Sequence, residues 1–114
     1  MRLVLADDET HVRSAVHLLL AEEPGVQVVA DCSTGACLVH AINEHKPDVA
    51  LVDWELPGLR AREIPLMCRV VAMSGRPDQR QAALRAGAVR FVCKGDAPDT
   101  LLSVLRELAG EAVE

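Results

Sequence analysis

Two kinds of hydrophobic pattern alternate along the chain. Short apolar runs predict buried strands, and longer segments with apolar residues three or four positions apart predict amphipathic helices. The predicted strands are residues 3–6, 26–30, 49–52, 70–73 and 89–93. The predicted helices are residues 9–22, a helix that opens at 33–35 and ends before Pro47, residues 78–86 and residues 98–110. Residues 59–67 carry a short and ambiguous pattern.

The alternation of strands and helices predicts an α/β fold, in which parallel strands are joined through helices. The strands are apolar along almost their whole length, so both faces of the sheet must be buried beneath helices. Right-handed crossovers then produce a doubly wound parallel sheet. The chain has 114 residues, half of them hydrophobic, and neither repeats nor a flexible linker, so we expect one domain over residues 1–114.

Composition narrows the class of protein. The formal net charge of −5 argues against direct binding of nucleic acid by this chain. No segment has the length of a membrane span, and the N-terminal apolar run is too short for a secretion signal, so we expect a cytoplasmic protein without membrane contact. The cysteines form no CxxC pair and show no zinc-binding spacing with the histidines, so we expect buried free thiols at Cys32, Cys37, Cys68 and Cys93.

Four of the five predicted strands end in polar residues. They are, in chain order, Asp7 with Asp8, then Asp53, Ser74 and Lys94. Taken singly, each residue has an ordinary explanation as a helix cap, a turn residue or a solvated charge. Together they are informative, because the carboxyl ends of parallel strands share the edge of the sheet at which ligands bind.

The residue types at this edge suit phosphoryl transfer. Clustered carboxylates repel one another and should take up a proton or a cation, and Mg²⁺ prefers carboxylate and phosphate oxygens. Lys94 adds a positive charge and Ser74 a hydroxyl donor, which suit a reaction that depends on positioning and charge neutralisation. A carboxylate can itself be the nucleophile and form an aspartyl phosphate.

Nearly the whole chain resembles the response-regulator receiver domain family. The segments that carry the resemblance are LVLADDE at residues 3–9, PDVALVDWELPG at 47–58, VVAMSG at 70–75 and VRFVCKGDAP at 89–98. They resemble, in turn, the family's acidic first strand, its phospho-acceptor strand, and the strands ending in its Ser or Thr and its lysine. Residues 7–35 are most similar to the NarL-type branch, whose members usually join the receiver to a helix-turn-helix domain.

The resemblance implies a flavodoxin-like (βα)5 fold with strand order 2-1-3-4-5. It also implies that Asp53 accepts a phosphoryl group from a histidine kinase. By the same resemblance, Asp8 and Asp53 bind Mg²⁺ directly, together with the backbone carbonyl of Glu55, while Asp7 acts mainly through water.

The remaining site residues would respond to phosphorylation. The resemblance implies that Lys94 pairs with Asp53 and then with the phosphoryl group, and that Ser74 turns to hydrogen-bond that group. Phe91 occupies the family's aromatic switch position, although simple core packing also explains a phenylalanine there. The switched surface would contact an output domain, a partner protein, or a second copy through the fourth and fifth helices.

The chain departs from the family around the acceptor. Only residues 59–67 separate the Pro-Gly turn from the fourth strand, where the family usually has a fuller third helix. Pro65 further disfavours a full-length helix, so we expect a shortened or irregular one. Trp54 and Glu55 flank the acceptor, and Glu55 brings a fourth carboxylate close to the site. We hypothesise that Glu55 alters the lifetime of the phosphoryl group.

The favoured function is a signalling switch rather than a turnover enzyme. Its output would be transcription regulation through a helix-turn-helix domain, which these residues do not contain. One alternative is a degenerate receiver that binds partners without phosphorylation. A minor alternative is a Mg²⁺-dependent phosphohydrolase that forms an aspartyl phosphate, but such enzymes usually carry the nucleophile after the first strand and a cap insertion. No GxGxxG or Walker pattern indicates nucleotide binding.

Overall fold

The computed structural model describes residues 1–111 and contains one parallel sheet of five strands. The strands are β1 (Arg2–Ala6), β2 (Gln27–Cys32), β3 (Val49–Asp53), β4 (Arg69–Ser74) and β5 (Arg90–Cys93). Their order across the sheet is β2-β1-β3-β4-β5, which confirms the doubly wound arrangement that the sequence predicts.

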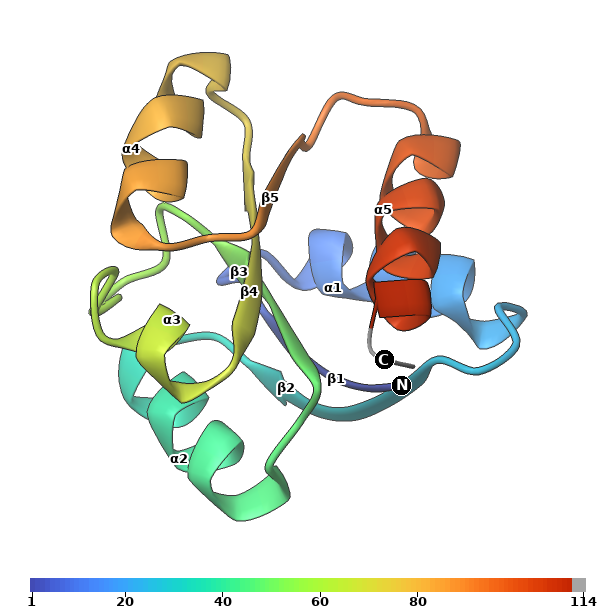
Figure 1. The fold of residues 1–114 in the computed structure, drawn as a ribbon, viewed down its shortest axis with the longest axis horizontal. Coiled ribbons are helices and arrows are strands. Elements are labelled where there is room, and N and C mark those ends of the chain that lie inside the picture. The colour runs from blue at the N-terminus through green and yellow to red at the C-terminus, as the bar shows by residue number, and fades with distance from the viewer. Residues whose placement is uncertain (112–114) are drawn as a thin grey trace.

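Helices cover both faces of the sheet (Figure 1). One face carries α1 (Thr10–Ala21) and α5 (Pro98–Glu111). The other face carries α2 (Gly35–His45), α3 (Ile64–Met67) and α4 (Arg80–Ala86), which follows the short 3-10 turn η1 (Pro77–Gln79). None of the helices in the described part of the chain has the length and apolar character needed to cross a bilayer.

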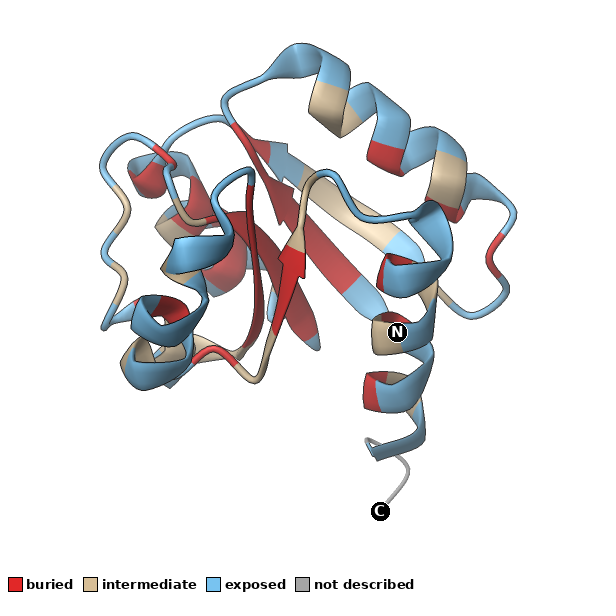
Figure 2. Ribbon diagram, turned by 90° about the horizontal axis from the view of Figure 1, so that it is seen from above, coloured by how far each residue is buried: buried red, intermediate tan, exposed pale blue. Residues whose placement is uncertain are grey.

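Two hydrophobic clusters lie on opposite faces of the sheet, and alternate residues of the strands contribute to each. Beneath α1 and α5, the strand residues Leu5, Leu51 and Val71 pack against Leu20 and Leu105. Beneath α2, α3 and α4 lie other strand residues with Leu38, Ile42 and Ile64. The central strands are therefore buried along their length (Figure 2), which explains their continuous apolar sequences.

The third helix is short, as the sequence predicts, but Pro65 does not prevent it from forming. The helix has four residues, and Pro65 lies in its first turn. A proline is tolerated there because the backbone N–H that it lacks would have no partner within the helix. The expectation of a shortened third helix is therefore confirmed, and Pro65 is accommodated in its first turn.

Two expectations need correction. The second strand runs to Cys32 rather than ending at residue 30, because its last residues pair with β1 as far as the match of Ala6 with Cys32. The prediction of buried thiols holds for Cys32 alone: Cys37 is exposed in the first turn of α2, and Cys68 and Cys93 are half-buried.

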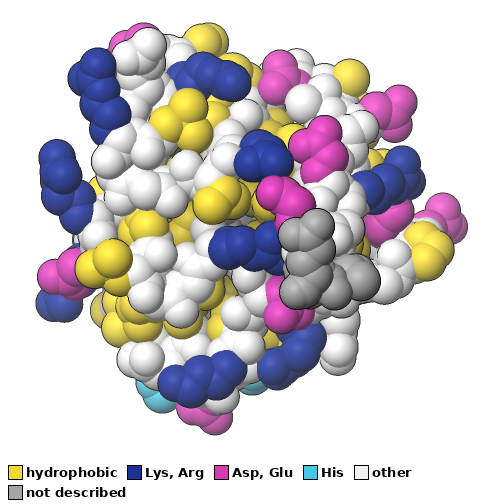
Figure 3. Space-filling model, viewed as in Figure 1, with side chains coloured by type: hydrophobic (Ala, Val, Ile, Leu, Met, Phe, Trp, Pro, Cys, Tyr) yellow, Lys and Arg dark blue, Asp and Glu magenta, His cyan; other side chains and the backbone are white. Residues whose placement is uncertain are grey.

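Charged side chains of both signs are interspersed over the face seen in Figure 3. On this face the Lys and Arg side chains form no continuous basic stripe of the kind that binds a nucleic-acid backbone.

Candidate functional site

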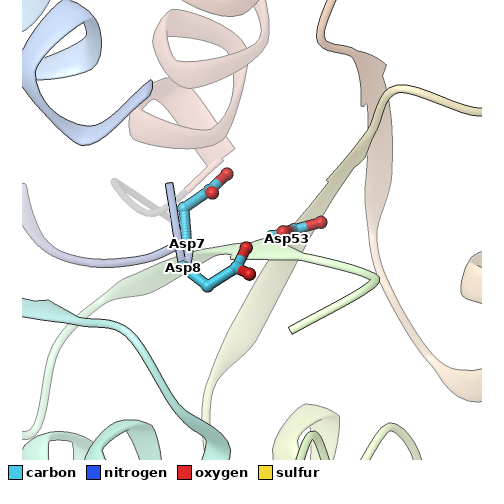
Figure 4. Close-up of side chains that lie close together, drawn as sticks. All are labelled: Asp7, Asp8 and Asp53. Carbon is cyan, nitrogen blue, oxygen red and sulfur yellow. The ribbon is translucent and has the colours of Figure 1, made fainter. Parts of the chain in front are cut away.

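Three carboxylates meet at the carboxyl edge of the sheet, as the sequence predicts. Asp7 and Asp8 directly follow β1, and Asp53 is the last residue of β3. One carboxylate oxygen from each lies within 4.8 Å of the others. Figure 4 shows the three side chains close together. Those of Asp7 and Asp53 are buried and that of Asp8 is exposed, so solvent reaches the cluster at Asp8.

Each buried aspartate also turns the chain at the end of its strand. Asp7 Oδ1 accepts a hydrogen bond of 2.9 Å from the Glu9 N–H, and Asp53 Oδ1 accepts one of 3.0 Å from the Glu55 N–H. These bonds to the residue two positions ahead are Asx turns. One oxygen of each carboxylate, Oδ1, therefore forms the turn that ends the strand, and the other, Oδ2, is left for other partners. This double role explains why an aspartate occupies the end of each of these strands.

Lys94 connects these second oxygens. Its backbone N–H donates to the Ser74 carbonyl at 2.9 Å, which fixes the residue beside the end of β4. Its Nζ lies 2.8 Å from Asp7 Oδ2, 3.3 Å from Asp53 Oδ2 and 3.3 Å from Glu9 Oε2. Glu9 is thus the third acid that contacts the lysine, and its position directly after Asp7 and Asp8 is the one sequence signal for it.

The pKa values of the site reflect burial among like charges. Burial raises the pKa of Asp53, and the charge of Asp7 adds to this effect, while the Glu55 hydrogen bond and Lys94 oppose it. Burial alone would lower the pKa of Lys94, but the close negative charge of Asp7, together with Asp53 and Glu9, raises it above the ordinary value. The lysine is therefore charged, and one positive charge faces several carboxylates.

The donor set fits a hard divalent cation. Asp7 Oδ2 is buried and, among the residues that the structure describes, has no hydrogen-bond partner, because Lys94 Nζ is close to it but outside hydrogen-bonding geometry. A buried carboxylate oxygen with only partial neutralisation favours a cation nearby. Asp7, Asp8 and Asp53 supply the oxygen ligands that Mg²⁺ prefers.

Ser74 and Glu55 form a second side-chain contact close to Asp53. Ser74 is buried at the end of β4; its Oγ accepts from the Arg76 N–H at 3.0 Å and donates to Glu55 Oε1 at 3.4 Å. Arg76 Nε lies 4.0 Å from the same Glu55 oxygen, an ion pair that sequence reasoning missed. The Glu55 side chain thus faces Ser74 and Arg76 rather than joining the three clustered aspartates.

Phe91 belongs to the core in this conformation. It lies in β5 opposite Ala72, and its side chain is buried in the cluster beneath α2, α3 and α4. The Arg80 guanidinium lies 5.9 Å from the centre of the ring, at the start of α4. The structure does not bring Phe91 to the acidic cluster, and its role as a switch stays a prediction.

The loop that follows Asp53, residues 54–58, is fixed against the start of α2. The Gly35 N–H donates to the Pro57 carbonyl at 2.8 Å. A Cβ atom on Gly35 would lie 2.0 Å from the Gly58 carbonyl oxygen, so only glycine permits this approach. The Pro-Gly turn after Asp53 is therefore positioned by α2 as well as by its own sequence.

Comparison with known proteins agrees with this geometry. A family model described as the response regulator receiver domain matches residues 3–106. The nitrate/nitrite response regulator protein NarL of Escherichia coli K12 is 30% identical over 121 residues, covering 97% of this chain and 56% of that protein. The transcriptional regulatory protein YhcZ of Bacillus subtilis is 28% identical, covering 97% of this chain and 56% of that protein. The chain spans about half the length of these curated relatives.

Solved structures give the same result. The signal receiver domain of NarL from Mycobacterium tuberculosis superposes with a TM-score of 0.81 at 32% identity, covering 96% of both chains. RcsB from Salmonella enterica serovar Typhimurium gives a TM-score of 0.86 at 20% identity, covering 97% of this chain and 62% of that one. At that identity the second match supports the fold alone.

Proposed function

This chain belongs to the response regulator receiver domain family, and from that membership we propose that it is the phospho-accepting receiver of a NarL-type two-component regulator. Asp53 accepts a phosphoryl group from a histidine kinase. The observation that carries the proposal is the buried Asp53 carboxylate at the end of β3, in contact with Lys94 and beside Asp7 and Asp8. The protein acts as a switch rather than as an enzyme with turnover.

The hydrogen bonds of Asp53 select its nucleophilic atom. Oδ1 accepts from the Glu55 N–H, whereas Oδ2 faces Lys94 at 3.3 Å. Oδ2 therefore attacks phosphorus, the new O–P bond forms, and the P–N bond of the kinase phosphohistidine breaks. Lys94 lies within reach of the incoming phosphoryl oxygens and neutralises part of their charge.

Asp7, Asp8 and Asp53 would hold Mg²⁺, with the Glu55 backbone carbonyl as a further ligand. The ion supplies positive charge that neutralises the carboxylates and the transferring phosphoryl group. The protein determines where the ion would bind. The Asx turn holds the Asp7 carboxylate, and the end of β3 holds that of Asp53, at the same edge of the sheet.

Phosphorylation would change the contacts of Ser74. Its hydroxyl now donates to Glu55, and a phosphoryl group on Asp53 offers stronger acceptor oxygens. Ser74 exchanges its bond to Glu55 for one to the phosphoryl group, and the Phe91 side chain changes its position in response. The surface made by α4, β5 and α5 then changes. That surface would contact an output domain or a second copy of the chain, and a helix-turn-helix output domain would bind DNA.

A groove beside Lys94 offers the kinase a docking surface. It lies between α1 and α5, has a volume of about 740 Å³ and is largely apolar, with Val12, Leu19 and Leu101 in its walls. Glu9 and Lys94 line the same groove, so a helix seated there would bring its phosphohistidine towards the acidic cluster.

A second candidate is a degenerate receiver that binds partners without phosphorylation. The observation that favours it is the four-residue α3, which is shorter than the helix usual in the family. This helix comes after the loop that follows Asp53, residues 54–58, which we call the acceptor loop.

The test uses Trp54, the single tryptophan, which is half-buried directly after Asp53. Mg²⁺ is titrated into the chain, beryllofluoride is then added, and Trp54 fluorescence is followed in the wild type and in Asp53→Asn. A working receiver gives a saturable Mg²⁺ response and a further beryllofluoride response that the variant lacks. Beryllofluoride responses of equal size in both proteins would contradict the proposal.

A further inference from the structure

Two of the free thiols lie in contact at the start of α2. The Cys37 Sγ donates a hydrogen bond to the Cys32 Sγ across a sulfur–sulfur distance of 2.7 Å. A disulfide bond is about 2.05 Å long, so the two sulfur atoms need to move by less than ~1 Å to bond. Among the residues that the structure describes, no other pair of thiols is hydrogen-bonded.

The two thiols differ in exposure and therefore in reactivity. Cys32 is the last residue of β2 and is 2% exposed, whereas Cys37 lies in the first turn of α2 and is exposed. Burial, with the hydrogen bond from Cys37, raises the pKa of Cys32 to about 12. An oxidant in solution therefore meets Cys37 first, because Cys32 is buried behind it.

We propose that Cys32 and Cys37 form a reversible intramolecular disulfide, so that the junction of β2 and α2 is a site of oxidation by peroxides. The peroxide oxidises the Cys37 thiol to a sulfenic acid and releases one water. The Cys32 sulfur then attacks the Cys37 sulfur, the S–O bond breaks, and the hydroxide leaves with the Cys32 proton as a second water. The two thiols together lose two electrons, which reduce the peroxide. An added dithiol then reduces the protein disulfide back to two thiols and becomes a disulfide itself.

The disulfide would stiffen the support of the acidic site. The Cys32 carbonyl accepts the Asp7 N–H at 2.9 Å, and Gly35, between the two cysteines, donates to Pro57 at 2.8 Å. A cross-link between Cys32 and Cys37 therefore holds a segment that contacts Asp7 on one side and the loop after Asp53 on the other. We expect a higher Tm and slower exchange of the Asp7 amide hydrogen in the oxidised protein.

The experiment treats the full chain with hydrogen peroxide and follows it by mass spectrometry after alkylation and trypsin digestion. Trypsin leaves both cysteines on the peptide of residues 14–60, while Cys68 and Cys93 lie on separate peptides. The proposal predicts that this peptide loses about 2 Da, escapes alkylation, and recovers both reactive thiols after dithiol treatment. It also predicts the same product in a Cys68→Ser, Cys93→Ser double variant.

Two results would overturn the proposal. One is oxidation of Cys37 to sulfinic acid while Cys32 remains reduced and alkylatable after unfolding. The other is cross-linking only between chains, which would mean that the two thiols do not meet. The Cys37→Ser variant tests the order of attack, because its remaining buried Cys32 should resist peroxide in the folded protein.

Discussion

Lys94 Nζ lies closer to Asp7 Oδ2, at 2.8 Å, than to Asp53 Oδ2, at 3.3 Å. Asp7 is fully buried, and the lysine is the one positive charge next to its Oδ2 within the described chain. The lysine therefore neutralises Asp7 first and holds the acceptor more loosely. This division leaves Asp53 Oδ2 accessible to a phosphoryl donor.

Removal of the lysine charge should destabilise the fold. In Lys94→Met, Asp7 becomes a buried carboxylate without a counter-charge, a change that typically costs about 3 kcal/mol. Urea unfolding in EDTA measures the loss. Mg²⁺ should restore part of it and stabilise the variant more than the wild type, because the cation takes over the neutralisation.

Arg85→Met is the matched control, since Arg85 is an exposed cation on α4 that donates a hydrogen bond to Gln81. Its unfolding free energy should stay within about 0.5 kcal/mol of the wild type. Equal stability of Lys94→Met and the control would contradict the assigned role.

Asp53 should make the fold less stable as pH rises. Burial and the neighbouring Asp7 raise its pKa in the folded state above the ordinary value of 3.8. At pH values just above 3.8, Asp53 therefore holds its proton more often in the folded protein than in the unfolded chain. Ionisation then lowers the free energy of unfolding as pH rises through the raised pKa. In EDTA, Asp53→Asn should melt above the wild type at pH 7, and the difference should shrink towards pH 4.

Asp78→Asn is the control for this comparison, because Asp78 is an exposed aspartate in η1. A pH-independent difference between Asp53→Asn and the wild type would rule out the charge explanation. Differential scanning calorimetry over a pH series measures both variants.

Gly35 should tolerate no side chain. In Gly35→Ala, the new Cβ would meet the Gly58 carbonyl oxygen at 2.0 Å, so α2 must move away from the acceptor loop. We expect a loss of about 2 kcal/mol or more in the free energy of unfolding.

Gly110→Ala makes the same substitution in open space on α5. It should raise stability by about 0.5–1 kcal/mol through helix propensity. Denaturant unfolding of the pair separates the steric effect from the general effect of a glycine replacement. A neutral Gly35→Ala would refute the close approach of α2 and the acceptor loop.

Glu55 should affect the lifetime of the phosphoryl group. Its carboxylate accepts a hydrogen bond from Ser74 and lies 4.0 Å from Arg76, close to Asp53. We expect the Glu55–Arg76 pair to hinder the approach of water to a phosphorylated Asp53. In Glu55→Gln the ion pair is lost, and hydrolysis of the phosphorylated protein should accelerate by about 2- to 10-fold.

Loss of the phosphorylated mass over time measures that rate, with Glu44→Gln on the exposed side of α2 as the control. Indistinguishable rates for Glu55→Gln and the wild type would contradict the role of Glu55.

The sequence was sufficient to predict the sheet and its polar edge. Strands such as residues 49–52 are continuously apolar, which indicates burial on both faces, and parallel strands then bring Asp7, Asp53 and Lys94 to one edge. The order of the strands came from the family resemblance, because hydrophobic periodicity carries no information about which strands are neighbours.

Side-chain contacts that the family resemblance does not imply were not predictable from the sequence. Glu9 and Lys94 are 85 positions apart, and nothing in their local sequence indicates that they pair. The contact of Cys32 with Cys37 was missed because the five-residue spacing matches no known thiol motif, and it arises only where β2 turns into α2. That α3 is short was predictable, because few residues separate the Pro-Gly turn from β4. The place of Pro65 in the first turn of α3 was not predictable.

The central claim is that Asp53 accepts a phosphoryl group, and the mass of the intact protein tests it most directly. The chain is incubated with Mg²⁺ and a small-molecule phosphodonor such as acetyl phosphate, in parallel with Asp53→Asn. We predict an adduct of about 80 Da on the wild type that EDTA prevents and that the variant lacks. The absence of an adduct, or an equal adduct on Asp53→Asn, would contradict the claim.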